Sequence, residues 1–331
     1  MGQSAHLGGS MNFSVALPTL RAFWRSRLAL LLVVLTWSTG CGRTNVVSID
    51  GSSTVYLLSA AIAEEFNEVS PDVKVVVSQA GTGGGFKKFA AGEIQICDAS
   101  RPITEAEAAA CKKNGIEFIK LEVAFDGLAV VVNPANDWCD SITTEQLKTI
   151  WRAEAAQSVT KWSDVNPDWP DVELELYGPG TDSGTYDYFT EVINGEAKSS
   201  RQDYSPSESD NALVQGVAGD KGSLGYFGLG YYAENTDKLK LLAVDSGGGP
   251  IVPTAETVRD GSYKPLARPL YIYVRKDALE NDGVVKYIEY YLEKMNEVSP
   301  QVGYVPVTDE VMQQNRETLE TSAPKAAGAA Q

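Results

Sequence analysis

The sequence is almost without histidine and is short of positive charge. His6 is the only histidine among 331 residues. A Ser-His-Asp triad, a Cys-His pair and most zinc sites need an imidazole, so these chemistries are disfavoured. The formal net charge is −16. Nucleic acid is a disfavoured partner for such a chain, because phosphate backbones attract basic surfaces.

A membrane-spanning run is also missing, since the apolar stretch LALLLVVLTW is too short for a comfortable span. It follows three arginines and ends in STGC, which resembles the lipobox of bacterial lipoproteins. The first 41 residues are therefore expected to be a signal segment. Cys41 would be the acylated residue, although Ser38 stands where leucine is usual. The alternative is an ordinary signal peptide cleaved nearby. Either one places the protein in the periplasm or at the cell surface of a bacterium.

Cysteine is scarce, with three residues after Cys41. An exported chain meets oxidising conditions, so one disulfide and one free thiol are expected. The predicted pair is Cys111 with Cys139. Cys97 lies in the strand-like IQICDAS and is expected to pack as a small hydrophobic residue.

What the chain does contain is a repeating order of strand, turn and helix. VVSI (46–49) and VKVVVS (73–78) have the composition of strands, and apolar spacing predicts a helix at 55–69. This order predicts an α/β sheet with helices on its faces. The length suggests two domains. The segment 321–331 is small and polar enough to be disordered.

Three predicted junctions between strand and helix share one chemistry. DGSSTV, GTGGGF and GTDSGTY each follow a β run and lead into a helix. A helix N-terminus offers free N–H donors and partial positive charge, and Gly, Ser and Thr let an anion reach them. Any one of these loops could be an ordinary helix cap. Three together favour an anion site.

Charged residues near these loops extend the prediction. Arg101 follows the strand IQICDAS, at the strand end where α/β folds collect ligands, and its guanidinium suits an oxyanion. Asp98 and Asp182 are either turn or helix caps or acceptors for the proton of hydrogen phosphate. Sulfate carries no such proton near neutral pH, so a carboxylate facing it would repel it.

Several motifs together resemble the phosphate-binding proteins of ABC transporters, the PstS family, and in particular its cyanobacterial-type lipoprotein branch. The motifs are DGSSTV, GTGGGFKKFAAGE, DASRPIT, FDGLAVVVNP, LYGPGTDSGTYDYFTE, DNALVQGVAGDKGSLGYFGLGYY and RPLYIYV. The resemblance covers nearly all of residues 45–320.

The resemblance implies a type II periplasmic-binding-protein fold, in which two α/β lobes joined by two crossing strands close on phosphate. The crossing strands are expected near 123–132 and 266–275. Lobe I would then comprise 45–125 and 266–320, and lobe II 126–265.

The resemblance also implies a set of ligands. The residues carried over are Ser53, Thr54 and the Val55 amide, Thr82 and Gly83, and Ser183, Gly184 and Thr185. The family's usual arginine position holds Pro179 here, and Arg101 stands where the family has an aspartate. Arg101 is therefore assigned as the cationic ligand, with Asp98 or Asp182 as the acceptor.

The predicted function is capture of inorganic phosphate and its delivery to a membrane permease, by a monomer without metal or cofactor. One alternative is a binding protein for sulfate, molybdate or an organic phosphate. Another is a phosphoryl hydrolase with Ser183 as nucleophile, which the absence of a histidine base disfavours.

Overall fold

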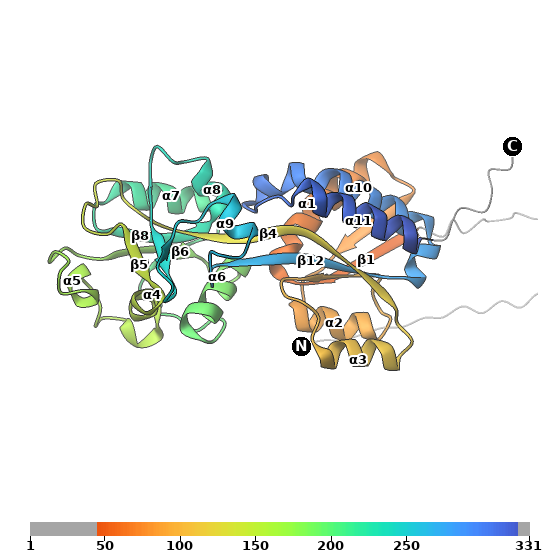
Figure 1. The fold of residues 1–331 in the computed structure, drawn as a ribbon, viewed down its shortest axis with the longest axis horizontal. Helices are drawn as coiled ribbons and strands as arrows, with labels where there is room; N and C mark the ends of the chain where they lie inside the picture. Colours follow the sequence, from red (N-terminus) through yellow and green to blue (C-terminus); the bar gives the residue numbers. More distant parts are fainter. Residues whose placement is uncertain (1–44, 324–331) are drawn as a thin grey trace, which may run out of the picture. The chain divides into compact units, whose positions relative to one another are not determined.

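The computed structural model describes residues 45–323 (Figure 1). The predicted signal segment with Cys41 and most of the predicted disordered tail lie outside these residues. In the described part, no helix is both long and apolar enough to cross a membrane.

A nine-stranded sheet of mixed direction forms the centre of the fold. Eight strands follow the order β2-β1-β3-β12-β4-β8-β6-β7, and β9 pairs with β4. The bounds are β1 Asn45–Gly51, β2 Val73–Val77, β3 Ile96–Ala99, β4 Phe118–Val132, β6 Glu175–Pro179, β7 Ser205–Ser207, β8 Ser223–Gly228, β9 Lys240–Leu241 and β12 Ala267–Arg275. A three-stranded sheet contains β5 Ser141–Thr143, β10 Ala243–Asp245 and β11 Pro250–Ile251.

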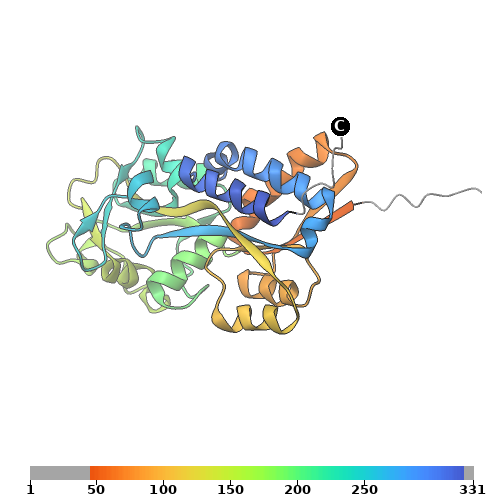
Figure 2. The same cartoon turned by 45° about the vertical axis from the view of Figure 1, so that its right-hand side comes forward.

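The two longest strands, β4 and β12, join the two ends of the large sheet. They pair antiparallel from Ala267↔Gly127 to Arg275↔Phe118 and run side by side in Figures 1 and 2. On its other edge β12 pairs with β3 through residues 271–274, whereas β4 extends past this pairing and binds β8 through residues 128–132. The prediction that these two β runs cross between lobes is confirmed. Residues 128–132 of β4 are all apolar and buried.

Helices lie on both faces of the sheet, as the alternation of strand and helix predicts. Around β1–β3, α1, α10 and α11 cover one face and α2 and α3 the other (Figure 1). Around β6 and β8, α7 and α8 lie opposite α4 and α6 (Figure 1). Their bounds are α1 Ser53–Val69, α2 Thr82–Ala90, α3 Glu105–Lys113, α4 Thr144–Trp151, α5 Trp162–Val165, α6 Gly184–Phe189, α7 Asp210–Gly219, α8 Leu229–Ala233, α9 Ala255–Arg259, α10 Asp282–Val298 and α11 Asp309–Ser322. Short 3-10 segments are η1 Ala153–Ala155, η3 Asp277–Glu280 and η4 Ser299–Val302, and a π-helical turn, η2 Thr190–Asn194, extends α6.

The glycine-rich segment after β2 is the first turn of α2 rather than a loop leading to it. Gly81 precedes the helix at φ 74°, a conformation that favours glycine. Gly85 lies inside the helix against β1, where an added Cβ would lie 2.6 Å from the Cα of Gly51. Close packing of α2 against β1 therefore requires glycine at position 85. This glycine is explained by packing and not by the approach of an anion.

The predicted disulfide between Cys111 and Cys139 is wrong, because Cys97, Cys111 and Cys139 are all free and buried. Cys111 is on α3 and packs in a small cluster that contains Phe86 and Phe89. Cys139 belongs to the main hydrophobic core and contacts the carbonyl of Ser141 at 3.4 Å. The two thiols therefore lie in different hydrophobic clusters. Cys97 packs with the Cys111 cluster, as predicted.

Candidate anion-binding site

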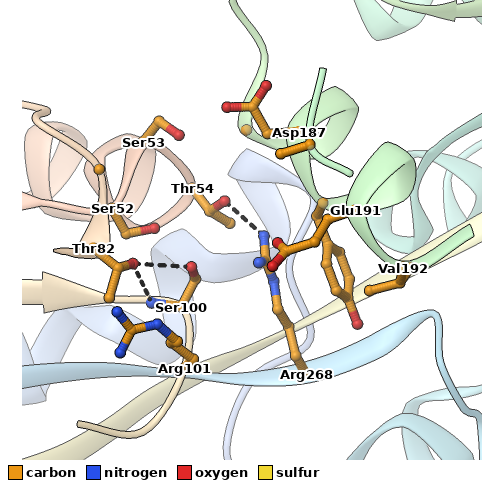
Figure 3. Close-up of a pocket in the computed structure, with 14 residues that line it drawn as sticks. Ser52, Ser53, Thr54, Thr82, Ser100, Arg101, Asp187, Glu191, Val192 and Arg268 are labelled. Carbon is orange, nitrogen blue, oxygen red and sulfur yellow. Dashed lines mark hydrogen bonds between the residues drawn. The ribbon is translucent and has the colours of Figure 1, made fainter. Parts of the chain in front are cut away.

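A pocket of about 390 Å³ opens where β1 and β3 end and α1, α2 and α6 begin (Figure 3). Its polar lining consists of hydroxyl residues and charged residues from segments far apart in the sequence. The hydroxyl residues are Ser52, Ser53, Thr54, Thr82 and Ser100, and the charged residues are Arg101, Asp187, Glu191 and Arg268. Hydroxyls and guanidinium groups together suit an oxyanion.

A second pocket of about 200 Å³ adjoins the first, and Ser53 and Gly184 line both. At this boundary a Cβ on Gly184 would lie 2.6 Å from Oγ1 of Thr54. Glycine therefore allows the N-terminus of α6 to approach that of α1. The rest of the predicted third loop, Asp182, Ser183 and Thr185, lines the second pocket.

The N-terminus of α1 is held by its own cap. Oγ of Ser52 accepts a hydrogen bond from the amide of Val55 at 3.4 Å. Val55 is buried and lines neither pocket, so the predicted Val55 donor is turned to its cap. Ser53 and Thr54 lie on the pocket side (Figure 3). α6 is capped similarly, since Oγ of Ser183 accepts from the amide of Thr185 at 3.2 Å.

The start of α2 is joined to the end of β3. Oγ1 of Thr82 lies 3.2 Å from Oγ of Ser100 and accepts a hydrogen bond from the amide of Ser100 at 3.2 Å (Figure 3). These contacts place both hydroxyls at the pocket. Gly83 is not part of the lining, although a Cβ there would lie 3.8 Å from Nη2 of Arg101.

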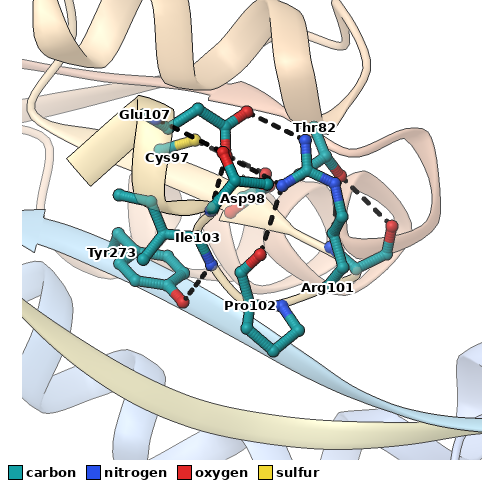
Figure 4. Close-up of polar contacts among 10 residues, drawn as sticks. Thr82, Cys97, Asp98, Arg101, Pro102, Ile103, Glu107 and Tyr273 are labelled. Atoms are coloured by element: carbon teal, nitrogen blue, oxygen red, sulfur yellow. Dashed lines mark hydrogen bonds and ion pairs between the residues drawn. The ribbon is translucent and has the colours of Figure 1, made fainter. Parts of the chain in front are cut away.

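Arg101 lines the pocket, as predicted, but it is paired with an acid. Its guanidinium donates to both carboxylate oxygens of Glu107, at 2.9 and 2.8 Å (Figure 4). Glu107 also accepts from the amide of Thr104 in the capping box of α3. The hydrogen bonds from Arg101 lower the pKa of Glu107 to about 2. The positive charge of Arg101 is therefore compensated by Glu107. The side chain of Arg101 is 41% exposed.

A second arginine, Arg268, lies deeper in the pocket and was missed by the sequence prediction. Its Nη2 donates to Oγ1 of Thr54 at 2.8 Å, and Nε and Nη2 both contact Oδ2 of Asp126. The guanidinium stacks on the ring of Tyr188, with Cζ 3.6 Å from the ring centroid. Its side chain is only 15% exposed. Arg268 thus contacts residues at the start of α1 and on α6, while it stands on a crossing strand.

A sequence signal for Arg268 exists but is weak. RPLYIYV reads as a β run, and an arginine at its start is as typical of a surface as of a pocket. Only the register Arg268↔Asp126 shows that this arginine opposes a buried acid on β4. Ser100 was missed for a similar reason, because DASR places several polar residues at a single strand end.

The two predicted proton acceptors lie elsewhere. Asp98 is fully buried beneath α1, where Oδ1 accepts a hydrogen bond from Oγ of Ser59 at 3.0 Å. Burial is the main cause that raises the pKa of Asp98 to about 8. Asp182 is exposed and lines the second pocket. Neither carboxylate belongs to the pocket that holds the two arginines.

Two α/β lobes that share crossing strands, with a pocket of hydroxyls and guanidiniums at helix N-termini, define an extracytoplasmic solute-binding protein by fold class. The family model for a PBP superfamily domain matches residues 39–294. Among relatives, the Staphylococcus saprophyticus phosphate-binding protein PstS is 38% identical over 273 residues, which cover 81% of this chain and 82% of that protein. The chain therefore belongs to the PBP superfamily and, within it, to the PstS family of phosphate-binding proteins.

Two further similarities support this family and the predicted fold. Protein SphX of Synechocystis is 44% identical over 284 residues, covering 86% of this chain and 84% of that protein. The crystal structure of a possible phosphate binding protein from Planctomyces limnophilus has 47% sequence identity and a TM-score of 0.81. It covers 85% of this chain and 99% of its own. The predicted resemblance and the two-lobed α/β fold are confirmed.

Proposed function

We propose that this protein captures inorganic phosphate in the pocket between α1, α2 and α6 and delivers it to an ABC permease. The observation that carries the proposal is the pairing of Arg268 with Thr54 inside a pocket lined by hydroxyls. Capped helix N-termini add dipoles that favour an anion. The Staphylococcus saprophyticus relative is a phosphate-binding protein, which agrees with this ligand.

The proposed ligands are the predicted loop residues together with Arg268. From the three loops they are Ser53, Thr54, Val55, Thr82, Gly83, Ser183, Gly184 and Thr185, and Arg101 after β3 is added to them. The ligands that line the second pocket contact the same phosphate as those of the first, at the boundary where Ser53 and Gly184 line both pockets. The amide of Val55 donates to the ligand after it gives up its hydrogen bond to Oγ of Ser52. The lobes 45–125 with 266–320 and 126–265 close around this boundary as the unit of capture.

Export and anchoring complete the proposal. The N-terminal segment directs the chain across a bacterial membrane, and Cys41 carries the lipid that holds it there. A lipid anchor keeps a monomeric binding protein close to its permease and raises its effective concentration at that partner.

A phosphoryl hydrolase is the second candidate class, and the geometry gives it little support. Ser183, the nucleophile it would need, caps α6 and accepts a hydrogen bond from the amide of Thr185. Nucleophilic catalysis requires an adjacent base to remove the serine proton. We therefore propose that the chain acts as a binding protein and not as an enzyme.

The proposal is tested on protein that lacks residues 1–41, by measuring phosphate and sulfate binding with isothermal titration calorimetry. Saturable phosphate binding at one site, with weaker sulfate binding, is the expected result. Tighter binding of sulfate or molybdate would replace phosphate by another oxyanion. Release of phosphate from a generic phosphate ester, abolished by Ser183→Ala, would establish the hydrolase instead.

A further inference from the structure

The guanidinium of Arg268 is occupied along one edge and free at the other. Nε and Nη2 contact Oδ2 of Asp126, and Nη2 also donates to Oγ1 of Thr54. Among residues 45–323, no atom accepts a hydrogen bond from Nη1. A guanidinium holds its donors in a rigid planar fork, so the plane of the group decides where Nη1 points. The side chain that fixes this plane therefore determines whether Nη1 reaches a bound anion.

The hydrogen bonds of Arg268 do not fix this plane by themselves. Nε and Nη2 share one carboxylate oxygen of Asp126, and hydrogen bonds to such an oxygen tolerate a broad range of directions. These contacts hold the position of one edge of the guanidinium but leave the group free to tilt about it. A further contact on the face of the group is needed to remove this freedom.

Tyr188 provides the contact on the face. The centroid of its ring lies 3.6 Å from Cζ of Arg268, which is the geometry of a cation–π interaction. Tyr188 lines the pocket but is only 5% exposed. Cation–π contacts are stronger where water is excluded, so this ring restrains the tilt of the guanidinium.

The ring of Tyr188 is itself held by a hydrogen bond at its far end. Its hydroxyl donates to the carbonyl of Pro265 at 2.6 Å. Burial is the main cause that raises the pKa of Tyr188, so the hydroxyl keeps its proton and remains a donor. Pro265 precedes β12, the strand that carries Arg268. The ring is thus anchored to the same segment as the arginine that it covers.

These contacts join two helices that meet at the pocket. Tyr188 belongs to α6 and Thr54 to α1, and Arg268 contacts both. We propose that Tyr188 is a positioning residue, which fixes the plane of the Arg268 guanidinium and directs Nη1 toward the bound phosphate. This inference rests on the proposed function and adds a residue that acts through the arginine rather than on the ligand.

The test compares Tyr188→Leu and Tyr188→Phe with Tyr186→Leu. Tyr186 is a second buried tyrosine of α6, and it lines neither pocket. Isothermal titration calorimetry measures the phosphate dissociation constant of each protein, and urea unfolding measures its stability. Tyr188→Leu removes the aromatic face and should raise the dissociation constant about tenfold. Tyr188→Phe retains the face and should raise it less than threefold. Tyr186→Leu should lower stability without changing phosphate affinity.

A double-mutant cycle shows whether Tyr188 acts through Arg268. Lysine has no planar fork for the ring to orient. In the Arg268→Lys protein, Tyr188→Leu should therefore change the phosphate dissociation constant less than threefold. Additive losses would overturn the proposal, because the ring would then contribute independently of the arginine. Equal losses in Tyr188→Phe and Tyr188→Leu would also overturn it, because the aromatic face would then have no role.

The remaining outcomes separate this inference from other failures. Where Tyr188→Leu does not fold, as judged by circular dichroism, Tyr188→Met replaces it with the same expected loss of affinity. A loss in Tyr186→Leu equal to that in Tyr188→Leu would assign the effect to a general loosening of α6 and would contradict the proposal. Absence of phosphate binding by the unsubstituted protein would refute the proposed function, whereas unchanged affinity in a folded Tyr188→Leu protein would refute this inference alone.

Discussion

Arg268 on β12 and Asp126 on β4 form a buried ion pair on adjacent crossing strands. Nε and Nη2 of the arginine lie 3.2 and 3.1 Å from Oδ2 of the aspartate, which is 0% exposed. Burial raises the pKa of Asp126, and Arg268 counteracts this effect. The fixed register of the two strands thus orients a guanidinium toward the pocket. An arginine held in this way loses little rotamer freedom when it binds an anion.

Replacing this arginine by lysine should weaken phosphate binding strongly. Arg268→Lys retains the charge but loses the planar fork that spans Asp126 and Thr54. We expect the phosphate dissociation constant to rise at least tenfold, equivalent to about 1.4 kcal/mol, in isothermal titration calorimetry. Lys88→Arg, outside this pocket, is the control. Unchanged affinity in Arg268→Lys would show that this guanidinium does not contact the ligand.

Arg101 should also contribute, through a different balance of charge. Arg101→Ala is expected to raise the phosphate dissociation constant at least tenfold, about 1.4 kcal/mol, with little change in thermal stability. Glu107→Gln is the matched variant, because glutamine retains the capping box while the charge partner of Arg101 is lost. It should bind phosphate as well as or better than the unsubstituted protein. Equal affinity in all three proteins would make Arg101 a surface residue.

Replacing either of two glycines in the same helical turn by alanine should affect stability differently. Gly85→Ala forces a Cβ to within 2.6 Å of the Cα of Gly51, so it should destabilise the fold by about 1–3 kcal/mol in urea unfolding. Gly83→Ala meets only Nη2 of Arg101, at 3.8 Å, which is an ordinary van der Waals contact, and should keep the stability of the unsubstituted protein. A stable Gly85→Ala protein would contradict the packing explanation for this glycine.

Asp98 should make the protein less stable as the pH rises. Its pKa in the fold is about 8 and its ordinary value is 3.8, chiefly because it is buried, with Ser59 opposing and Asp50 adding to the shift. Between these values the folded protein holds a proton that the unfolded chain has released. Stability is therefore lost progressively as the pH rises through this window.

Thermal unfolding from pH 5 to pH 9 checks this prediction. Asp98→Asn removes the titrating group and should unfold at a higher temperature than the unsubstituted protein at the alkaline end, with a flatter pH profile. Glu64→Gln, an exposed site on α1, should keep the original slope. Parallel profiles for Asp98→Asn and the unsubstituted protein would show that Asp98 does not titrate in this range.

The sequence predicts the fold well where local pattern and packing agree. The helix expected at 55–69 and the strand expected at 73–78 correspond to α1 and β2, because their apolar spacing matches the face they bury. The glycine-rich segment differs, since GTGGGF has low helix propensity but forms the first turn of α2. Packing against Gly51 outweighs that propensity. The disulfide prediction failed because cysteine spacing contains no information about which core each thiol enters.

The sequence by itself determines the α/β alternation, the three strand-to-helix junctions and the hydroxyls Ser53, Thr54 and Thr82 that line the pocket. Such features arise from residues close in the chain, where turn and capping preferences act locally. The tertiary structure alone decides that Arg268 faces the pocket and that Asp98 is buried away from it. The first depends on strand register, because β12 joins Arg268 to Asp126 more than a hundred positions away. The second depends on the packing of α1, whose Ser59 binds Asp98.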